Sequence, residues 1–188
     1  MKRFCTARRS SSAGFSLVEL LVVVAVACIV MAVAVPSVTA TMQSYSLNSG
    51  TQIVASTVRS ARLAAVSKNR QMRVLFNCPI AGQLRMVEVT GNAAIDNDAD
   101  RCSTTDYPFP DPNPAAVPNI DGPLVILPDG AQFGAFESVL IGTDGRVTPQ
   151  TGCPTACVAS AVPATVVLSN GNDTRTITIA ASGQVITP

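Results

Sequence analysis

The first forty residues carry a long apolar run. Sixteen consecutive apolar side chains occupy 20–35, and the stretch from Phe15 to Val35 is interrupted only by Ser16 and Glu19. As a helix, this stretch would extend about 31 Å at roughly 1.5 Å per residue, enough to cross the hydrocarbon core of a bilayer. The pattern predicts a membrane-spanning helix with one carboxylate inside it.

Beyond the apolar run, apolar positions recur with helical spacing. They fall at intervals of 7, 4, 3 and 4 residues and form one stripe: Leu47, Val54, Val58, Ala61 and Ala65. The stripe predicts an amphipathic helix over 37–69. Gly50 lies inside it and is expected to be a flexible point, weakening the helix by about 1 kcal/mol relative to Ala.

The remainder, 70–188, has the pattern of a β-rich globular domain. Six strands are expected: Met72–Phe76, Leu84–Thr90, Leu124–Leu127, Val139–Ile141, Ala164–Leu168 and Thr174–Ala180. A turn at 170–173 predicts that the last two form a hairpin, with Ile177 and Ile179 facing the core. Segment 91–123 is rich in Asp, Asn and Pro, and is expected to be a long surface loop.

The composition argues against an enzyme. The chain has 47% hydrophobic and 13% charged residues and no histidine, which removes the commonest general base and the commonest metal ligand. No nucleophile stands beside a base in the sequence. We therefore expect no catalytic residues and no cofactor.

The charge is unevenly distributed along the chain. Four of the 13 basic residues precede residue 14, so the part after the leader has nine basic against 12 acidic side chains, a net charge of −3. A domain of that charge is a poor general binder of nucleic acid. Binding of nucleic acid is therefore not expected.

Three ordinary interpretations of the N-terminal segment leave its acid unexplained. A secretory signal peptide would be cut after Ala32-Val33-Ala34 and would release a free periplasmic binding module. A lipoprotein would use Cys28, and a plain anchor would need only the apolar run after a basic segment. None of these three gives Glu19 a role.

A fourth interpretation accounts for the acid. The sequence Gly14-Phe15-Ser16-Leu17-Val18-Glu19, after a basic leader, resembles the processing site of type IV prepilins and pseudopilins. The resemblance implies removal of residues 1–14 by a prepilin peptidase and N-methylation of Phe15. It also implies that 15–36 form the transmembrane half of a long helix, which Pro36 would kink.

Cleavage would give Glu19 a partner. The new amine at Phe15 and the carboxylate of Glu19 are opposite charges at one end of an apolar helix, and each is costly in lipid without a partner. The resemblance implies that Glu19 also serves the amine of an adjacent subunit during filament assembly. A carboxylate at position 19 would then favour docking of the subunit in one axial register of the filament.

The rest of the chain narrows the resemblance. The sequences IVASTVRSARLAAVSKNRQMRVLF, FGAFESVLIGTDGRVTP and TRTITIAASGQV are similar to the FimT/GspH group of minor pilins and pseudopilins. This implies an α+β fold with a long N-terminal helix packed on antiparallel sheets. It further implies an inner-membrane anchor, a periplasmic body, and as partners other pilins or pseudopilins and an inner-membrane assembly platform.

The resemblance leaves two machines open, a type IV pilus and the type II secretion pseudopilus. DNA-binding members of the group carry a Gly-Arg-x-Arg pair near the C-terminus, where this chain has Gly183-Gln184-Val185-Ile186. That departure argues against a minor pilin for DNA uptake. The residual candidates for weak polyanion contacts are Arg59, Arg62, Arg146 and Arg175.

Four cysteines fall in the globular part and allow three pairings. The pairing Cys78–Cys102 with Cys153–Cys157 is favoured, because the first would join a strand end to the following loop. A four-cysteine zinc site is the alternative, although neither spacing is that of a zinc ribbon. The acids at 96, 98 and 100 resemble the start of a calcium loop but lack its Gly and its bidentate Glu, so no metal is expected.

Overall fold

The structure, a computed structural model, describes residues 15–113 and 115–187, without the side chains of Val33, Val35 and Pro36. The predicted leader and Gly14 of the predicted cleavage site lie outside the described residues. The chain divides into an N-terminal unit that ends at Ala40 and a globular unit that begins at Thr41. Each unit is described by itself below.

The N-terminal unit is the first part of helix α1 (Leu17–Lys68). Every side chain described in this unit is exposed. Because consecutive apolar residues surround the helix on all sides, there is no polar face to meet water. The helix is long and apolar enough to cross a membrane, by length and composition.

In the globular unit, the predicted stripe of α1 faces the core. All five members are at most 1% exposed: Leu47, Val54, Val58, Ala61 and Ala65. Gly50 faces the sheets at close range, and its predicted flexibility stays a prediction. Its Cα lies so close to the sheets that an added Cβ would stand 3.3 Å from Cδ1 of Leu168 and 3.6 Å from Cδ2 of Leu127.

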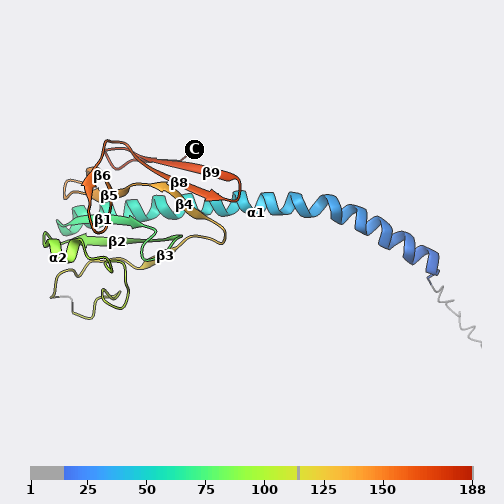
Figure 1. The fold of residues 1–188 in the computed structure, drawn as a ribbon, viewed down its shortest axis with the longest axis horizontal. Helices are drawn as coiled ribbons and strands as arrows, with labels where there is room; N and C mark the ends of the chain where they lie inside the picture. The colour runs from blue at the N-terminus through green and yellow to red at the C-terminus, as the bar shows by residue number, and fades with distance from the viewer. Residues whose placement is uncertain (1–14, 114, 188) are drawn as a thin grey trace, which may run out of the picture. The chain divides into compact units, whose positions relative to one another are not determined.

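The strands form two antiparallel sheets beside α1 (Figure 1). The six-stranded sheet has the order β3-β2-β1-β5-β6-β7, with β3 (Leu124–Ile126), β2 (Gln83–Val89), β1 (Gln71–Phe76), β5 (Ser138–Ile141), β6 (Val147–Thr151) and β7 (Val158–Ala159). The four-stranded sheet has the order β10-β9-β8-β4, with β10 (Val185–Ile186), β9 (Asp173–Ile179), β8 (Ala164–Asn170) and β4 (Gln132–Phe136). The α+β fold class, a long helix on antiparallel sheets, is confirmed.

One hydrophobic core joins α1 to both sheets. The rings of Phe76, Phe133 and Phe136 pack against one another with centroids 5.1 to 6.3 Å apart. In the β8–β9 hairpin, Ile177 and Ile179 are fully buried, as the alternation predicts. Every member of this core belongs to the globular unit, so the unit needs nothing from the first forty residues to bury its apolar surface.

The six predicted strands are present, and the sequence missed β4, β6, β7 and β10. Helix α1 ends at Lys68, one residue before the predicted end of the amphipathic helix at 69. Arg73 lies in β1 and is only 5% exposed.

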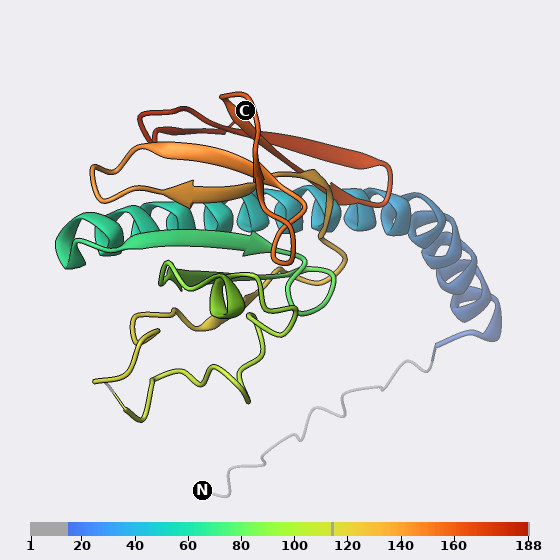
Figure 2. The same cartoon turned by 60° about the vertical axis from the view of Figure 1, so that its left-hand side comes forward.

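Segment 91–123 differs from the expected surface loop. It contains the short helix α2 (Ala93–Asp96) and several buried polar residues, including Arg101 and Asp121. In both ribbon views it lies beside β2 and β3, on the side away from the β8–β9 hairpin (Figure 2). Polar contacts, rather than apolar packing, hold this segment in its conformation, and they are described in the next subsection.

Candidate functional site

The first candidate site is the exposed start of α1. Phe15 is 78% exposed, and Glu19 lies in the first turn of the helix. An acid in a first turn is favourably placed with respect to the helix dipole. Neither residue has a neighbour that would cover it within the described part of the N-terminal unit.

The apolar residues that follow are equally uncovered. Their exposed fractions lie between 54% and 69%: Leu20, Leu21, Val22, Val23, Val24, Val26, Ile29, Val30 and Met31. Burial of apolar surface is worth about 25 cal/mol per Å², so a surface of this kind is covered in any stable state of the protein. Lipid and the apolar helices of other protein chains both provide cover of this kind.

Helix α1 continues without interruption through position 36. A proline inside a helix removes one hydrogen bond and is a usual cause of a kink. The side chain of Pro36 is outside the described residues, so the kink stays a prediction.

The second candidate surface is the solvent face of α1 in the globular unit. Arg59, Arg62, Leu63 and Val66 line a groove of about 350 Å³, and we call these four residues the helix patch. Leu63 is 71% and Val66 52% exposed. The patch therefore combines two cations with an uncovered apolar surface.

The structure brings some of the predicted polyanion-binding arginines together. Nε of Arg62 donates to the carbonyl oxygen of Gly145 at 3.2 Å, which brings the turn that carries Arg146 to the helix patch. Arg146 itself is exposed and pairs with Asp144 at 3.5 Å. Arg175 lies on β9, with no ionic partner among the described residues.

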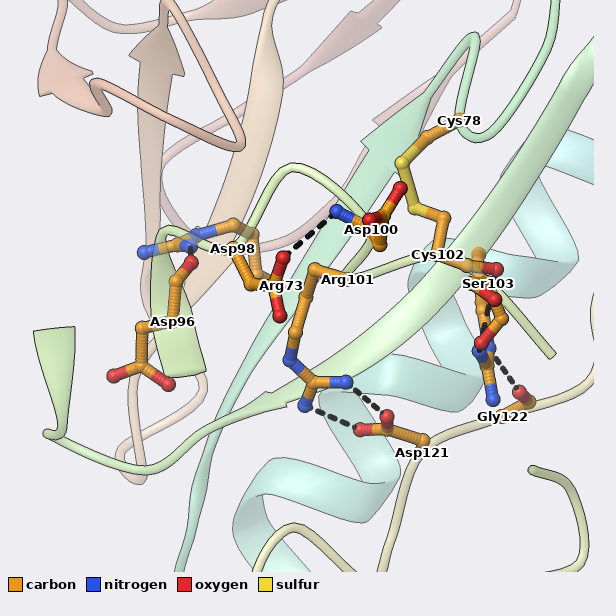
Figure 3. The surroundings of a disulfide bond; sticks show 11 residues. Arg73, Cys78, Asp96, Asp98, Asp100, Arg101, Cys102, Ser103, Asp121 and Gly122 are labelled. Carbon is orange, nitrogen blue, oxygen red and sulfur yellow. Dashed lines mark hydrogen bonds and ion pairs between the residues drawn. A yellow bond between two sulfur atoms is a disulfide. The ribbon is translucent and has the colours of Figure 1, made fainter. Parts of the chain in front are cut away.

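The third candidate is segment 91–123, which three arginines hold against the six-stranded sheet. Arg101 forms a two-pronged ion pair with Asp121, with Nη2 2.8 Å from Oδ1 and Nη1 in contact with Oδ2 (Figure 3). Its Nη2 also donates to the carbonyl oxygen of Glu88 on β2. The Arg101 side chain is fully buried, so this ion pair is part of the folded interior and not a surface contact.

Arg85 on β2 is the second arginine that holds segment 91–123 against the sheet. Its guanidinium donates to four carbonyl oxygens of the segment, those of Cys102, Ser103, Tyr107 and Gly122, at 2.6 to 3.3 Å. Burial lowers the pKa of Arg85, and the nearby carboxylate of Asp121 opposes this shift. A single fully buried cation thus collects backbone acceptors that would otherwise lack donors.

Arg73 on β1 is the third arginine that holds segment 91–123 against the sheet. Its Nη1 donates to the carbonyl oxygen of Asp96 in α2, and its Nε to the side chain of Gln150 on β6, both at 2.9 Å. The Asp96 carboxylate in turn accepts from the backbone N–H groups of Thr90 and Gly91 at 2.8 Å. The start of the segment is therefore fixed to the centre of the sheet.

A part-buried hydrogen bond joins two residues in the middle of the segment. The hydroxyl of Tyr107 donates to Oδ2 of Asp98 at 2.8 Å, and Arg101 lies over the Tyr107 ring at 4.4 Å. Burial, with this hydrogen bond, raises the pKa of Tyr107 to about 12. The N–H of Asp100, with the same hydroxyl, lowers the pKa of Asp98.

Two disulfides complete the arrangement. Cys78 pairs with Cys102 and Cys153 with Cys157, which is the pairing that the sequence favoured. Cys78 and Cys102 pack with Leu75 and Val87 in a small second core, and Cys153 contacts that core from one side. Because the four cysteines are oxidised, they are not ligands of a zinc ion.

The structure gives two of the three acids of the calcium-like sequence other roles. Asp96 caps backbone groups, Asp98 accepts from Tyr107, and the described residues contain no group of three or more metal-ligating side chains. Sequence reasoning missed the three buried arginines, because no periodic pattern distinguishes a buried cation from an exposed one. Their clearest signal is that Arg73 and Arg85 each stand between apolar residues of a strand.

Comparison with known proteins bears on the N-terminal segment. The family model of the prokaryotic N-terminal methylation motif matches residues 9–35. The chain carries this processing motif. The resemblance to the processing site of type IV prepilins and pseudopilins is thereby confirmed for this segment. The narrower FimT/GspH resemblance stays a prediction.

Among solved structures, two crystal forms of the type IV minor pilin FimU from Pseudomonas aeruginosa are similar to this chain. The TM-scores are 0.45 and 0.46, each at 12% identity and over 76% of this chain. The matches cover 92% and 87% of the FimU chains. No curated protein matches the sequence.

Proposed function

We propose that this protein is a minor pilin or pseudopilin, a non-enzymatic subunit that is cut after Gly14, N-methylated at Phe15 and assembled into a filament. One observation carries the proposal. A processing motif stands at the head of a helix whose apolar side chains are exposed throughout the described N-terminal unit. Filament assembly explains both, since a helix stored in lipid would then be covered by the helices of neighbouring subunits.

In this proposal Glu19 neutralises an amine that exists only after cleavage. The acid stays exposed on α1, one turn from Phe15, and is available to the amine of its own chain or of an adjacent subunit. An uncompensated charge in an apolar environment costs several kcal/mol, so a subunit is held where the pair forms. The partners are a prepilin peptidase, other pilins or pseudopilins and an inner-membrane assembly platform.

The proposed location follows from the charge of the leader. Basic residues before an apolar span stay on the cytoplasmic side, which places the globular unit in the periplasm. Two disulfides in that unit agree with an oxidising compartment. The FimT/GspH resemblance extends the proposal to filament initiation or protein secretion, in a type IV pilus or a type II secretion pseudopilus.

Mass spectrometry of the mature protein tests this proposal. The expected N-terminal peptide begins with N-methylated Phe15. A mature chain that begins at Val35 would instead support a free periplasmic module released by signal peptidase, and would overturn the proposal.

A further inference from the structure

The globular unit presents two surfaces of opposite charge. The helix patch is basic, and the part of α1 that belongs to this unit contains no acid. Segment 91–123 contains six aspartates and one arginine. Since Arg101 is buried with Asp121, and Asp96 is also buried, four aspartates are left to give the surface of the segment a negative charge.

The acidic surface also has a hollow that suits an apolar side chain. Asp106, Tyr107, Asp111, Pro112, Val117 and Pro118 are among the residues that line a depression of about 520 Å³, and we call these six the loop face. Val117 is 40% exposed. The loop face thus offers apolar walls beside carboxylates, whereas the helix patch offers apolar side chains beside cations.

The helix patch is not covered by its own chain. Arg59 is exposed and has no hydrogen bond or ion pair with any described residue, and Leu63 is uncovered. The carboxylate of Asp106 likewise has no partner in the described part of the chain. The two surfaces share no residue, so the helix patch of one molecule can contact the loop face of another.

We infer that the loop face of one subunit docks on the helix patch of a second copy. Leu63 enters the hollow of the loop face, and Arg59 and Arg62 meet Asp106 and Asp111. Arg85 donates to the carbonyl oxygen of Tyr107 in the loop face, and Arg101 and the Cys78–Cys102 disulfide tie the residues just before it to the body of the globular unit. These contacts limit the entropy lost on docking. This inference rests on the proposed function in one respect, the presence of subunits side by side in a membrane or filament, where confinement raises their effective concentration.

The test uses two differently tagged full-length copies produced in the same cell. A photo-cross-linking amino acid replaces Leu63 in one copy, and mass spectrometry locates the cross-linked peptide. The expected product joins position 63 to residues 104–118 of the other copy, in the membrane fraction and in filaments. Cross-links only to lipid or to other proteins, or no cross-link to that segment, would overturn the inference.

Charge reversal separates specific docking from proximity. Arg59→Glu is expected to reduce the cross-linked yield about fivefold, and Asp106→Arg in the other copy to restore most of it. Arg175→Glu is the matched control, because it makes the same charge change outside both surfaces and should leave the yield unchanged. No rescue by the second reversal would contradict the pairing. An N-terminus other than N-methylated Phe15 would show separately that the proposed function had failed.

Discussion

Arg101 and Asp121 form a buried two-pronged ion pair that ties the middle of segment 91–123 to its end. Both side chains are at most 6% exposed, and Asp121 also accepts from the backbone N–H of Glu88 at 2.7 Å. The pair therefore joins two distant parts of the segment to the same point on β2. It explains why a sequence rich in Asp, Asn and Pro has a defined conformation.

Removal of one partner should destabilise the globular unit strongly. Asp121→Ala leaves the Arg101 guanidinium buried without a counter-charge, a change that typically costs about 3–5 kcal/mol. Denaturant unfolding followed by circular dichroism measures the loss. Asp106→Ala removes an exposed carboxylate of the same segment and should change the free energy of unfolding by less than about 0.5 kcal/mol. Equal effects of the two substitutions would contradict a structural role for the ion pair.

The sequence predicts those parts of the fold that depend on local periodicity. The stripe through Val54 and Val58 and the alternation at Ile177 and Ile179 are buried as predicted, because spacing alone decides which side faces the core. The burial of Arg85 could not be predicted from spacing. Its burial depends on carbonyl groups brought in from 102–122, a long-range polar contact that leaves no periodic signal.

The role of Gly50 likewise could not be predicted from local spacing. In the sequence it is a weak point of a helix, whereas in the structure it lets α1 approach the side chains of Leu127 and Leu168. The processing site, in contrast, could be recognised from the sequence because its chemistry is local. Glu19 stands out in the apolar stretch from Phe15 to Val35 whatever the rest of the chain does.

The close approach at Gly50 leads to a stability prediction. Gly50→Leu would place a large side chain against Leu168, and overpacking of this kind typically costs about 1–3 kcal/mol. Asn48→Leu, at an exposed position on the same helix, is the control and should be nearly neutral. Thermal unfolding of the two variants decides the matter. A Gly50→Leu variant as stable as the wild type would mean that the helix and sheets are not in close contact there.

The two disulfides should contribute unequally to stability. Cys78 and Cys102 are 24 residues apart and Cys153 and Cys157 only four. A chain-entropy model gives about 3.5 kcal/mol for the longer loop and about 2 kcal/mol for the shorter. Paired Cys→Ser variants, compared by denaturant unfolding, should therefore rank in that order. The reverse order would show that loop closure does not dominate their effect.

The Tyr107 hydroxyl should titrate at unusually high pH. Its pKa is raised from 10.0 to about 12, so the folded state favours the neutral phenol. The resulting stability is fully present below pH 10.0 and is lost as the pH rises towards about 12. Absorbance of tyrosinate follows the titration, with Tyr107→Phe identifying the signal. Asp98→Ala removes the acceptor and should lower the pKa of Tyr107; an unchanged titration would remove the hydrogen bond from the explanation.

Glu19 should act after processing and not during it. Glu19→Ala leaves Gly14, Phe15 and the apolar run unchanged, so we expect normal membrane insertion and N-methylated Phe15 by mass spectrometry. Incorporation into filaments should fall at least about tenfold, since the amine of Phe15 then has no carboxylate in an apolar surrounding. Glu19→Asp, which keeps the charge on a shorter side chain, should retain part of the incorporation. Normal incorporation of Glu19→Ala would show that the amine finds its partner elsewhere, and would remove the carboxylate from the assembly mechanism.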